Sequence, residues 1–182
     1  MVISAPPIAM GVALGVAATA ASFDLRRGEI PNWLTLPPLV VSPFVYGLAF
    51  GNEYAMHSLA AASLSALVPY LMFCRGAMGG GDVKLFGALG AITGFDLRVG
   101  IEIELGALLV ALVVACGALA WNGTLLRTLG NALRHAFDPL LPRAWRRQRR
   151  KALSARIRMG GPIFAATVVF AAPYLFDAWS RS

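Results

Sequence analysis

Residues 101–121 read IEIELGALLVALVVACGALAW, and beyond Glu104 this stretch carries no charged side chain. A helix needs roughly 17 to 25 mostly apolar residues to cross a bilayer core about 30 Å thick, and this stretch is long enough. In lipid, a helix also lets a single segment satisfy its own backbone hydrogen bonds. The stretch therefore predicts a transmembrane α-helix.

Five similar apolar runs lie on either side of this one. They cover approximately residues 5–23, 34–50, 57–74, 83–97 and 160–178. Of the 182 residues, 58% are hydrophobic and only 14% are charged, which leaves too little polar surface to cover a water-soluble domain. We therefore predict an all-α integral membrane protein, with a single membrane domain over residues 1–182 and six transmembrane helices.

The basic residues indicate how these helices are oriented. Fourteen of the 16 lysines and arginines fall in or beside the segments that follow the first, third and fifth runs. Lys and Arg accumulate on the cytoplasmic side of membrane proteins, so both the N-terminus and the C-terminus should lie outside. Arg98 and Arg181 remain for the other side. Five acids are expected there too: Glu53, Asp96, Glu102, Glu104 and Asp177.

Charge and cysteine usage argue against several other classes of protein. The net charge is +7, but the basic residues are confined to interruptions between apolar runs. They do not form a face that could follow a phosphate backbone, so we expect no nucleic-acid partner. Cys74 and Cys116 lie in different apolar runs and do not suffice for a disulfide framework or a zinc site of four Cys or His ligands. We expect neither a metal nor another cofactor.

Residues 122–159 form a basic cytoplasmic segment between the fifth and sixth predicted helices. Its second half, residues 142–159, reads PRAWRRQRRKALSARIRM, in which Trp145 and Leu153 lie among arginines. This composition is typical of a helix lying on anionic lipid, with its apolar side chains among the headgroups. A flexible charged loop is the alternative.

Two acidic residues lie where a charge is costly, at the cytoplasmic ends of predicted helices. Asp82 follows Gly79, Gly80 and Gly81 and precedes an apolar run. It could simply cap that helix by accepting hydrogen bonds from backbone amides. Asp24 lies near the C-terminal end of the first helix, where the helix dipole disfavours an anion, so capping does not account for it.

Asp24 and Asp82 should lie at the same membrane depth, which suggests a catalytic pair. Two carboxylates a few ångströms apart cannot both ionise, so one can hold a proton while the other accepts a proton from water. The pair then supplies a general acid and a general base for peptide-bond hydrolysis. The three glycines would let an extended substrate backbone approach closely, although a plain turn between two helices also explains them.

Two segments around these aspartates resemble motifs of the type IV prepilin peptidases. Residues 23–35 read FDLRRGEIPNWLT, similar to a segment of that family in which an aspartate and a short basic stretch precede IPNxLT. Residues 78–85 read MGGGDVKL, similar to the family's GxGD motif, which is typically followed by Val or Ile and Lys. The six predicted helices extend the resemblance over nearly the whole chain. Residues 160–163, GGPI, are only weakly similar to a Pro-bearing motif of the last helix.

The resemblance implies an intramembrane aspartic endopeptidase of the bacterial inner membrane, associated with type IV pili and secretion. Such an enzyme removes the short basic leader of prepilin-like membrane proteins at the cytoplasmic face, usually after a glycine. Asp24 and Asp82 would be the catalytic residues. The residues that support the site or bind substrate would be Pro31, Asn32, Gly79, Gly80, Gly81 and Lys84. For Lys84, an interfacial lysine that extends to reach water is the alternative.

Larger bacterial members of this family carry an additional cytoplasmic domain with cysteine pairs, which is associated with N-methylation of the new terminus. Here about ten residues join the first two predicted helices, and the cysteine pairs are missing. The chain therefore resembles the short form found with tight-adherence (Flp) pilus systems, and no methyltransferase activity is expected. The alternative functions are a small membrane transporter and a non-catalytic pilus or secretion assembly protein.

Small side chains on the first helix predict close packing there. Counting back from Asp24 in steps of three and four residues gives Ala21, Ala20, Ala17 and Ala13, which share one helix face. We expect this alanine stripe to face the fourth helix or the substrate helix.

Overall fold

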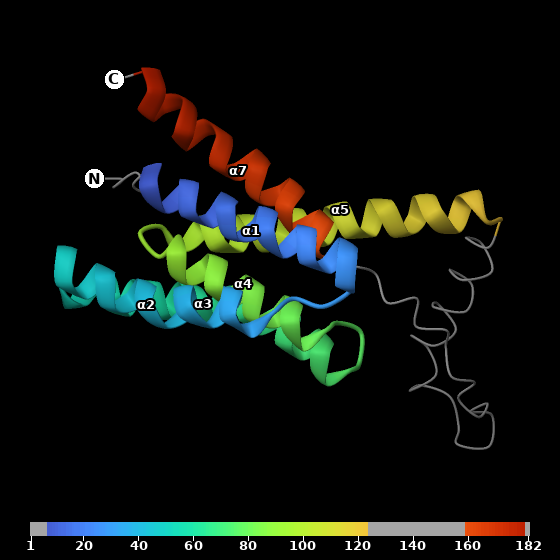
Figure 1. Ribbon diagram of the computed structural model, residues 1–182, viewed down its shortest axis with the longest axis horizontal. Helices are drawn as coiled ribbons and strands as arrows, with labels where there is room; N and C mark the ends of the chain where they lie inside the picture. The colour runs from blue at the N-terminus through green and yellow to red at the C-terminus, as the bar shows by residue number, and fades with distance from the viewer. Residues whose placement is uncertain (1–6, 124–158, 181–182) are drawn as a thin grey trace, which may run out of the picture. The chain divides into compact units, whose positions relative to one another are not determined.

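The computed structural model describes residues 7–123 and 159–180, and all of the regular structure in these ranges is helical (Figure 1). The helices are α1 (Pro7–Arg27), α2 (Asn32–Phe50), α3 (Asn52–Cys74), α4 (Gly80–Ile92), α5 (Leu97–Trp121) and α7 (Gly160–Ser180). The prediction of an all-α chain is confirmed for these residues. The lipid-binding helix predicted at residues 142–159 lies outside them, apart from its last residue.

Two compact units divide the chain. One contains residues 1–110 and 156–182, and the other contains residues 111–155. The first unit holds α1 to α4, α7 and the first part of α5. Both segments that resemble the peptidase motifs belong to this unit.

Five helices are long and apolar enough to cross a membrane: α1, α2, α3, α5 and α7. Together they indicate a multi-pass membrane protein. They correspond to five of the six predicted spans, and their ends differ from the expected ones by a few residues.

The sixth predicted span, at residues 83–97, corresponds to a shorter helix. α4 has 13 residues, which at 1.5 Å per residue is roughly 20 Å, less than a bilayer core of about 30 Å. It ends at Ile92 because the chain then turns, with the Asp96 amide donating a hydrogen bond to the Thr93 carbonyl before α5 begins. Length alone therefore does not make α4 a span.

α4 is enclosed by protein rather than by lipid. Residues 85–92 are all buried, and the helix contacts α1, α2 and α3. Glycine permits the close approach of α3: a Cβ atom on Gly90 would lie 2.6 Å from the Ala61 carbonyl oxygen, and one on Gly94 would lie 2.4 Å from Ser58 Cα. Because protein surrounds it, α4 does not need the length that lipid demands.

Aromatic rings hold the C-terminal end of α4 against α2 and α3. The ring of Phe95 contacts those of Tyr46, Phe50 and Tyr54, with centroids 4.9, 4.6 and 5.1 Å away. The Tyr46 hydroxyl also donates a hydrogen bond to the Ile92 carbonyl oxygen. These contacts hold α4 along its axis and so help to fix the position of Asp82 at its other end.

α1 packs through its alanine stripe. All four alanines of the stripe are buried, and α1 contacts α7 more extensively than it contacts α4. Figure 1 shows the start of α7 beside the last turns of α1. A Cβ atom on Gly160, the first residue of α7, would lie 3.1 Å from Ala21 Cα. The stripe was expected to face the fourth helix or a substrate helix, and at this end its neighbour is α7.

The first part of α5 buries an acidic residue. Gly100 lies so close to α3 that a Cβ atom there would be 2.5 Å from Ser65 Oγ. One turn further on, Glu104 is only 3% exposed, and its Oε1 atom has no hydrogen-bond partner among the described residues. Glu104 was predicted to lie toward the outer side with the other acids, and the structure shows that its side chain is buried in the helix packing of α5.

Candidate active site

Asp24 lies in the last turn of α1 and is almost completely buried, with 5% of its surface exposed. Its Oδ2 atom accepts a hydrogen bond of 2.8 Å from the backbone amide of Gly160. The helix ends just beyond it because Gly28 adopts a positive φ of 69° and donates its amide to the Asp24 carbonyl oxygen at 2.9 Å. The carboxylate is therefore held between the end of α1 and the start of α7.

Asp82 is the third residue of α4 and is half-buried. Its Oδ2 atom accepts a hydrogen bond of 3.2 Å from the amide of Gly79, which precedes the helix. The capping interaction that the sequence allowed is therefore present. It occupies one oxygen of the carboxylate with a backbone donor, and it orients the side chain at the start of α4.

The two motif segments meet in space although about fifty residues separate them. Lys84 Nζ donates a hydrogen bond of 2.8 Å to Asn32 Oδ1. A Cβ atom on Gly81 would lie 3.2 Å from Ile30 Cβ, so this glycine lets α4 approach the connection between α1 and α2. Lys84 is thus tied to the first turn of α2, which gives its amine a partner other than water.

The remaining motif residues lie around this junction. Pro31 caps the start of α2 with an extended backbone. Gly79 holds the equivalent place before α4. Gly80 packs against the Phe73 ring, because a Cβ atom on Gly80 would lie 3.4 Å from a carbon atom of that ring. The C-terminal end of α1 and the N-terminal ends of α2, α4 and α7 lie at one end of the helix bundle (Figure 1). The structure therefore brings all of the predicted site residues to that end.

Gly160, whose amide binds Asp24, lies in a segment that resembles the family's motif only weakly. A Cβ atom on Gly160 would lie 2.7 Å from Asp24 Cβ and 2.9 Å from its Oδ2, whereas one on the adjacent Gly161 would meet nothing within 4 Å. The signal in the sequence was a Gly-Gly-Pro at the start of an apolar run. It could suggest a helix start, but not which glycine touches Asp24.

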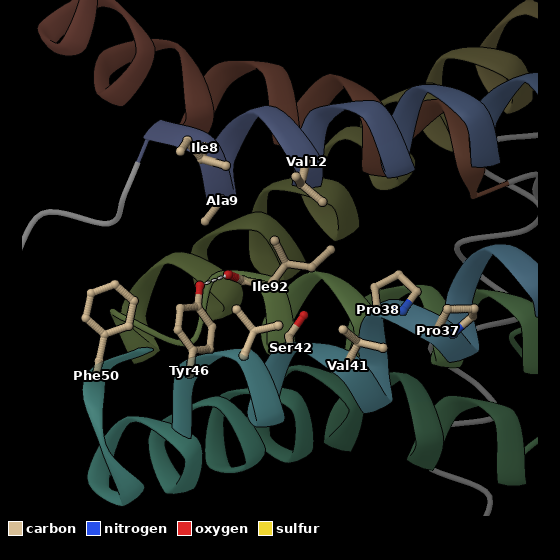
Figure 2. Close-up of a pocket in the computed structure, with 11 residues that line it drawn as sticks. Ile8, Ala9, Val12, Pro37, Pro38, Val41, Ser42, Tyr46, Phe50 and Ile92 are labelled. Atoms are coloured by element: carbon tan, nitrogen blue, oxygen red, sulfur yellow. Dashed lines mark hydrogen bonds between the residues drawn. The ribbon is translucent and has the colours of Figure 1, made fainter. Parts of the chain in front are cut away.

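A separate apolar cavity of about 520 Å³ lies between α1 and α2. Figure 2 shows Ile8 and Val12 of α1 facing α2 across it, with Ile92 of α4 also lining it. The Tyr46 hydroxyl in its wall already donates to a backbone carbonyl. Ile8 and Val12 precede Asp24 by three turns or more of α1, so their part of the cavity lies well away from that carboxylate.

No group of three or more His, Cys, Asp or Glu side chains in the described ranges is placed to hold a metal ion. The chemistry available at the junction is that of carboxylates, backbone amides and the Lys84 amine.

Comparison with known proteins identifies the family. A sequence model described as the type IV leader peptidase family matches residues 11–129. The chain belongs to the type IV leader peptidase family. The matched range contains both motif segments and ends before α7, so the Gly160 contact with Asp24 lies partly outside it. No curated protein and no solved structure matches the chain significantly.

Proposed function

We propose that this leader peptidase family member is an intramembrane aspartic endopeptidase with Asp24 and Asp82 as its catalytic pair. Its substrate is a prepilin-like membrane protein, from which it removes the short basic leader at the cytoplasmic face. The observation that carries the proposal is the junction of the two motif segments, through Lys84 and Asn32, in a chain of a peptidase family. Each segment brings one aspartate to the same end of the bundle (Figure 1).

In the proposed reaction, one carboxylate accepts a proton from a water molecule as the water oxygen attacks the scissile carbonyl carbon. The other, protonated carboxyl group donates its proton to the carbonyl oxygen. When this gem-diol intermediate breaks down, the C–N bond is cleaved and the leaving amine takes the proton that the first carboxylate had accepted. The second carboxylate takes back a proton from one of the two hydroxyl groups as the C=O bond reforms. Each aspartate is thus needed in both its proton-donating and its proton-accepting form.

The neighbouring motif residues support this chemistry without taking part in it. Gly80 and Gly81 let the start of α4, which carries Asp82, pack closely against Phe73 and Ile30. Asn32 and Lys84 hold the start of α2 against α4. Pro31 sets the backbone direction at the start of α2.

The same proposal includes the orientation in the membrane. The distribution of 14 of the 16 basic residues supports an active site on the cytoplasmic side, with α4 as a sixth, protein-enclosed crossing, both termini outside and the basic segment on anionic lipid. The resemblance to the prepilin peptidases implies that the membrane is a bacterial inner membrane. α1 and α2 are separated only by residues 28–31. A domain for N-methylation is therefore not expected between them, and the chain acts as a short-form peptidase like those of tight-adherence pilus systems.

The proposal is tested by reconstituting the purified protein with a prepilin-like substrate in lipid vesicles and measuring leader removal by mass spectrometry. Asp24→Asn and Asp82→Asn should each abolish cleavage. Asn keeps a side-chain oxygen for the amide donor in each case, so both variants should fold. Asp96→Asn, in the turn before α5, is the matched control and should cleave at the parent rate. Cleavage by either of the first two variants at the parent rate would show that the pair is wrongly assigned.

A further inference from the structure

We infer that Gly160 is a positioning residue for Asp24, acting through its backbone amide and through its lack of a side chain. The inference rests on the proposed function, because it gives α7 a part in the same site. Gly160 does not touch the reacting atoms. It sets where the Asp24 carboxylate can be when they react.

The amide of Gly160 is suited to this task by its place in the helix. The first amides of an α-helix have no acceptor within the helix, and the positive end of the helix dipole lies there. Gly160 is the first residue of α7, and its amide donates to Asp24 Oδ2 at 2.8 Å. This hydrogen bond therefore gives a partner both to a free amide of α7 and to a buried oxygen of Asp24. The start of α7 also favours a negative charge, because the positive end of its helix dipole lies there.

The missing side chain is equally important. A Cβ atom on Gly160 would lie 2.7 Å from Asp24 Cβ and 2.9 Å from Oδ2, closer than such atoms can approach. It would also lie 3.1 Å from the Cα atom of Ala21, which is backbone and cannot yield easily. An alanine at position 160 would therefore push the Asp24 side chain or the start of α7 away and lengthen the hydrogen bond.

A displacement of this kind should act on catalysis more than on substrate binding. Misplacing a catalytic group by about 1 Å can cost on the order of 100-fold in rate. The substrate itself need not contact Gly160, because the amide is already bonded to Asp24. A loss in kcat with little change in KM is therefore the signature of a positioning role.

The adjacent glycine offers a matched control. Gly161→Ala makes the same chemical change one residue later in the first turn of α7, where an added Cβ atom meets nothing within 4 Å. We expect Gly160→Ala to lower kcat for leader cleavage about 100-fold, with KM changed by less than about threefold. Gly161→Ala should keep kcat within about twofold of the parent. Parent-like kcat in Gly160→Ala, or an equal loss in both variants, would overturn the inference.

A stability measurement that needs no substrate separates this inference from the proposed function. Asp24→Gly removes both side-chain atoms that an alanine at position 160 would meet. Gly160→Ala should therefore lower the Tm of the detergent-solubilised parent protein. The same substitution should lower the Tm of the Asp24→Gly variant much less. Equal Tm losses in both backgrounds would contradict the contact. Failure of the parent protein to cleave any prepilin-like substrate would overturn the proposed function and leave the Tm result to decide the contact.

Discussion

Replacing Gly90 with alanine tests the packing that holds α4, and with it Asp82, in place. The added Cβ atom would lie 2.6 Å from the Ala61 carbonyl oxygen and 2.8 Å from Ser65 Oγ, both on α3. Overpacking of this kind costs about 1–3 kcal/mol, and alanine returns roughly 0.5–1 kcal/mol through its better helix propensity. We expect Gly90→Ala to lower the free energy of unfolding by a net amount of up to about 2.5 kcal/mol.

Gly15→Ala on α1 is the matched control, because an added Cβ atom there meets nothing within 4 Å. It should raise the free energy of unfolding by roughly 0.5–1 kcal/mol, so the two variants should differ by the overpacking cost alone, about 1–3 kcal/mol. Denaturant titration in mixed micelles, followed by tryptophan fluorescence, measures both. If Gly90→Ala is as stable as Gly15→Ala, the close approach of α3 and α4 is not what stabilises this part of the bundle.

Two further predictions concern polar groups in the described helices. Lys84→Met and Asn32→Ala should each weaken the junction, and a double-mutant cycle on the free energy of unfolding should give a coupling of about 1 kcal/mol; zero coupling would mean that the Lys84–Asn32 bond contributes nothing to stability. Glu104→Met should raise the free energy of unfolding by about 1–3 kcal/mol, because it removes a buried carboxyl group, one oxygen of which has no hydrogen-bond partner in the part of the chain that the structure describes. A decrease measured in the same titration would show that Glu104 is stabilised by a partner.

The helical class and five of the spans could be predicted from the sequence because lipid imposes a minimum apolar length on any exposed helix. The ends of α4 could not be predicted in this way. Residues 85–92 are buried by protein on all sides, so the thickness of the bilayer does not set where the helix ends. The glycines that allow this enclosure, Gly90 and Gly94, were visible in the sequence, but their partners on α3 are distant in the chain.

The candidate site, too, could be predicted from the sequence only in part. The motif segments located Asp24 and Asp82, and the sequence correctly allowed a capping bond for Asp82. The contact between Asp24 and Gly160 joins residues 136 positions apart. Gly160 and Gly161 are both glycines, so the sequence alone does not indicate which of them contacts Asp24. The burial of Glu104 could not be predicted for a related reason: the face of a helix that its neighbours cover is not known until those neighbours are known.

The central claim is that Asp24 and Asp82 act as one catalytic unit. It is tested most directly by single-turnover cleavage of a prepilin-like substrate in vesicles by Asp24→Asn, Asp82→Asn and the double variant. Residues that act as a unit lose rate non-additively, so each single variant should lose about as much as the double variant. If the two single losses multiply in the double variant, or if either single variant keeps the parent rate, the two carboxylates do not share one reaction and the account is wrong.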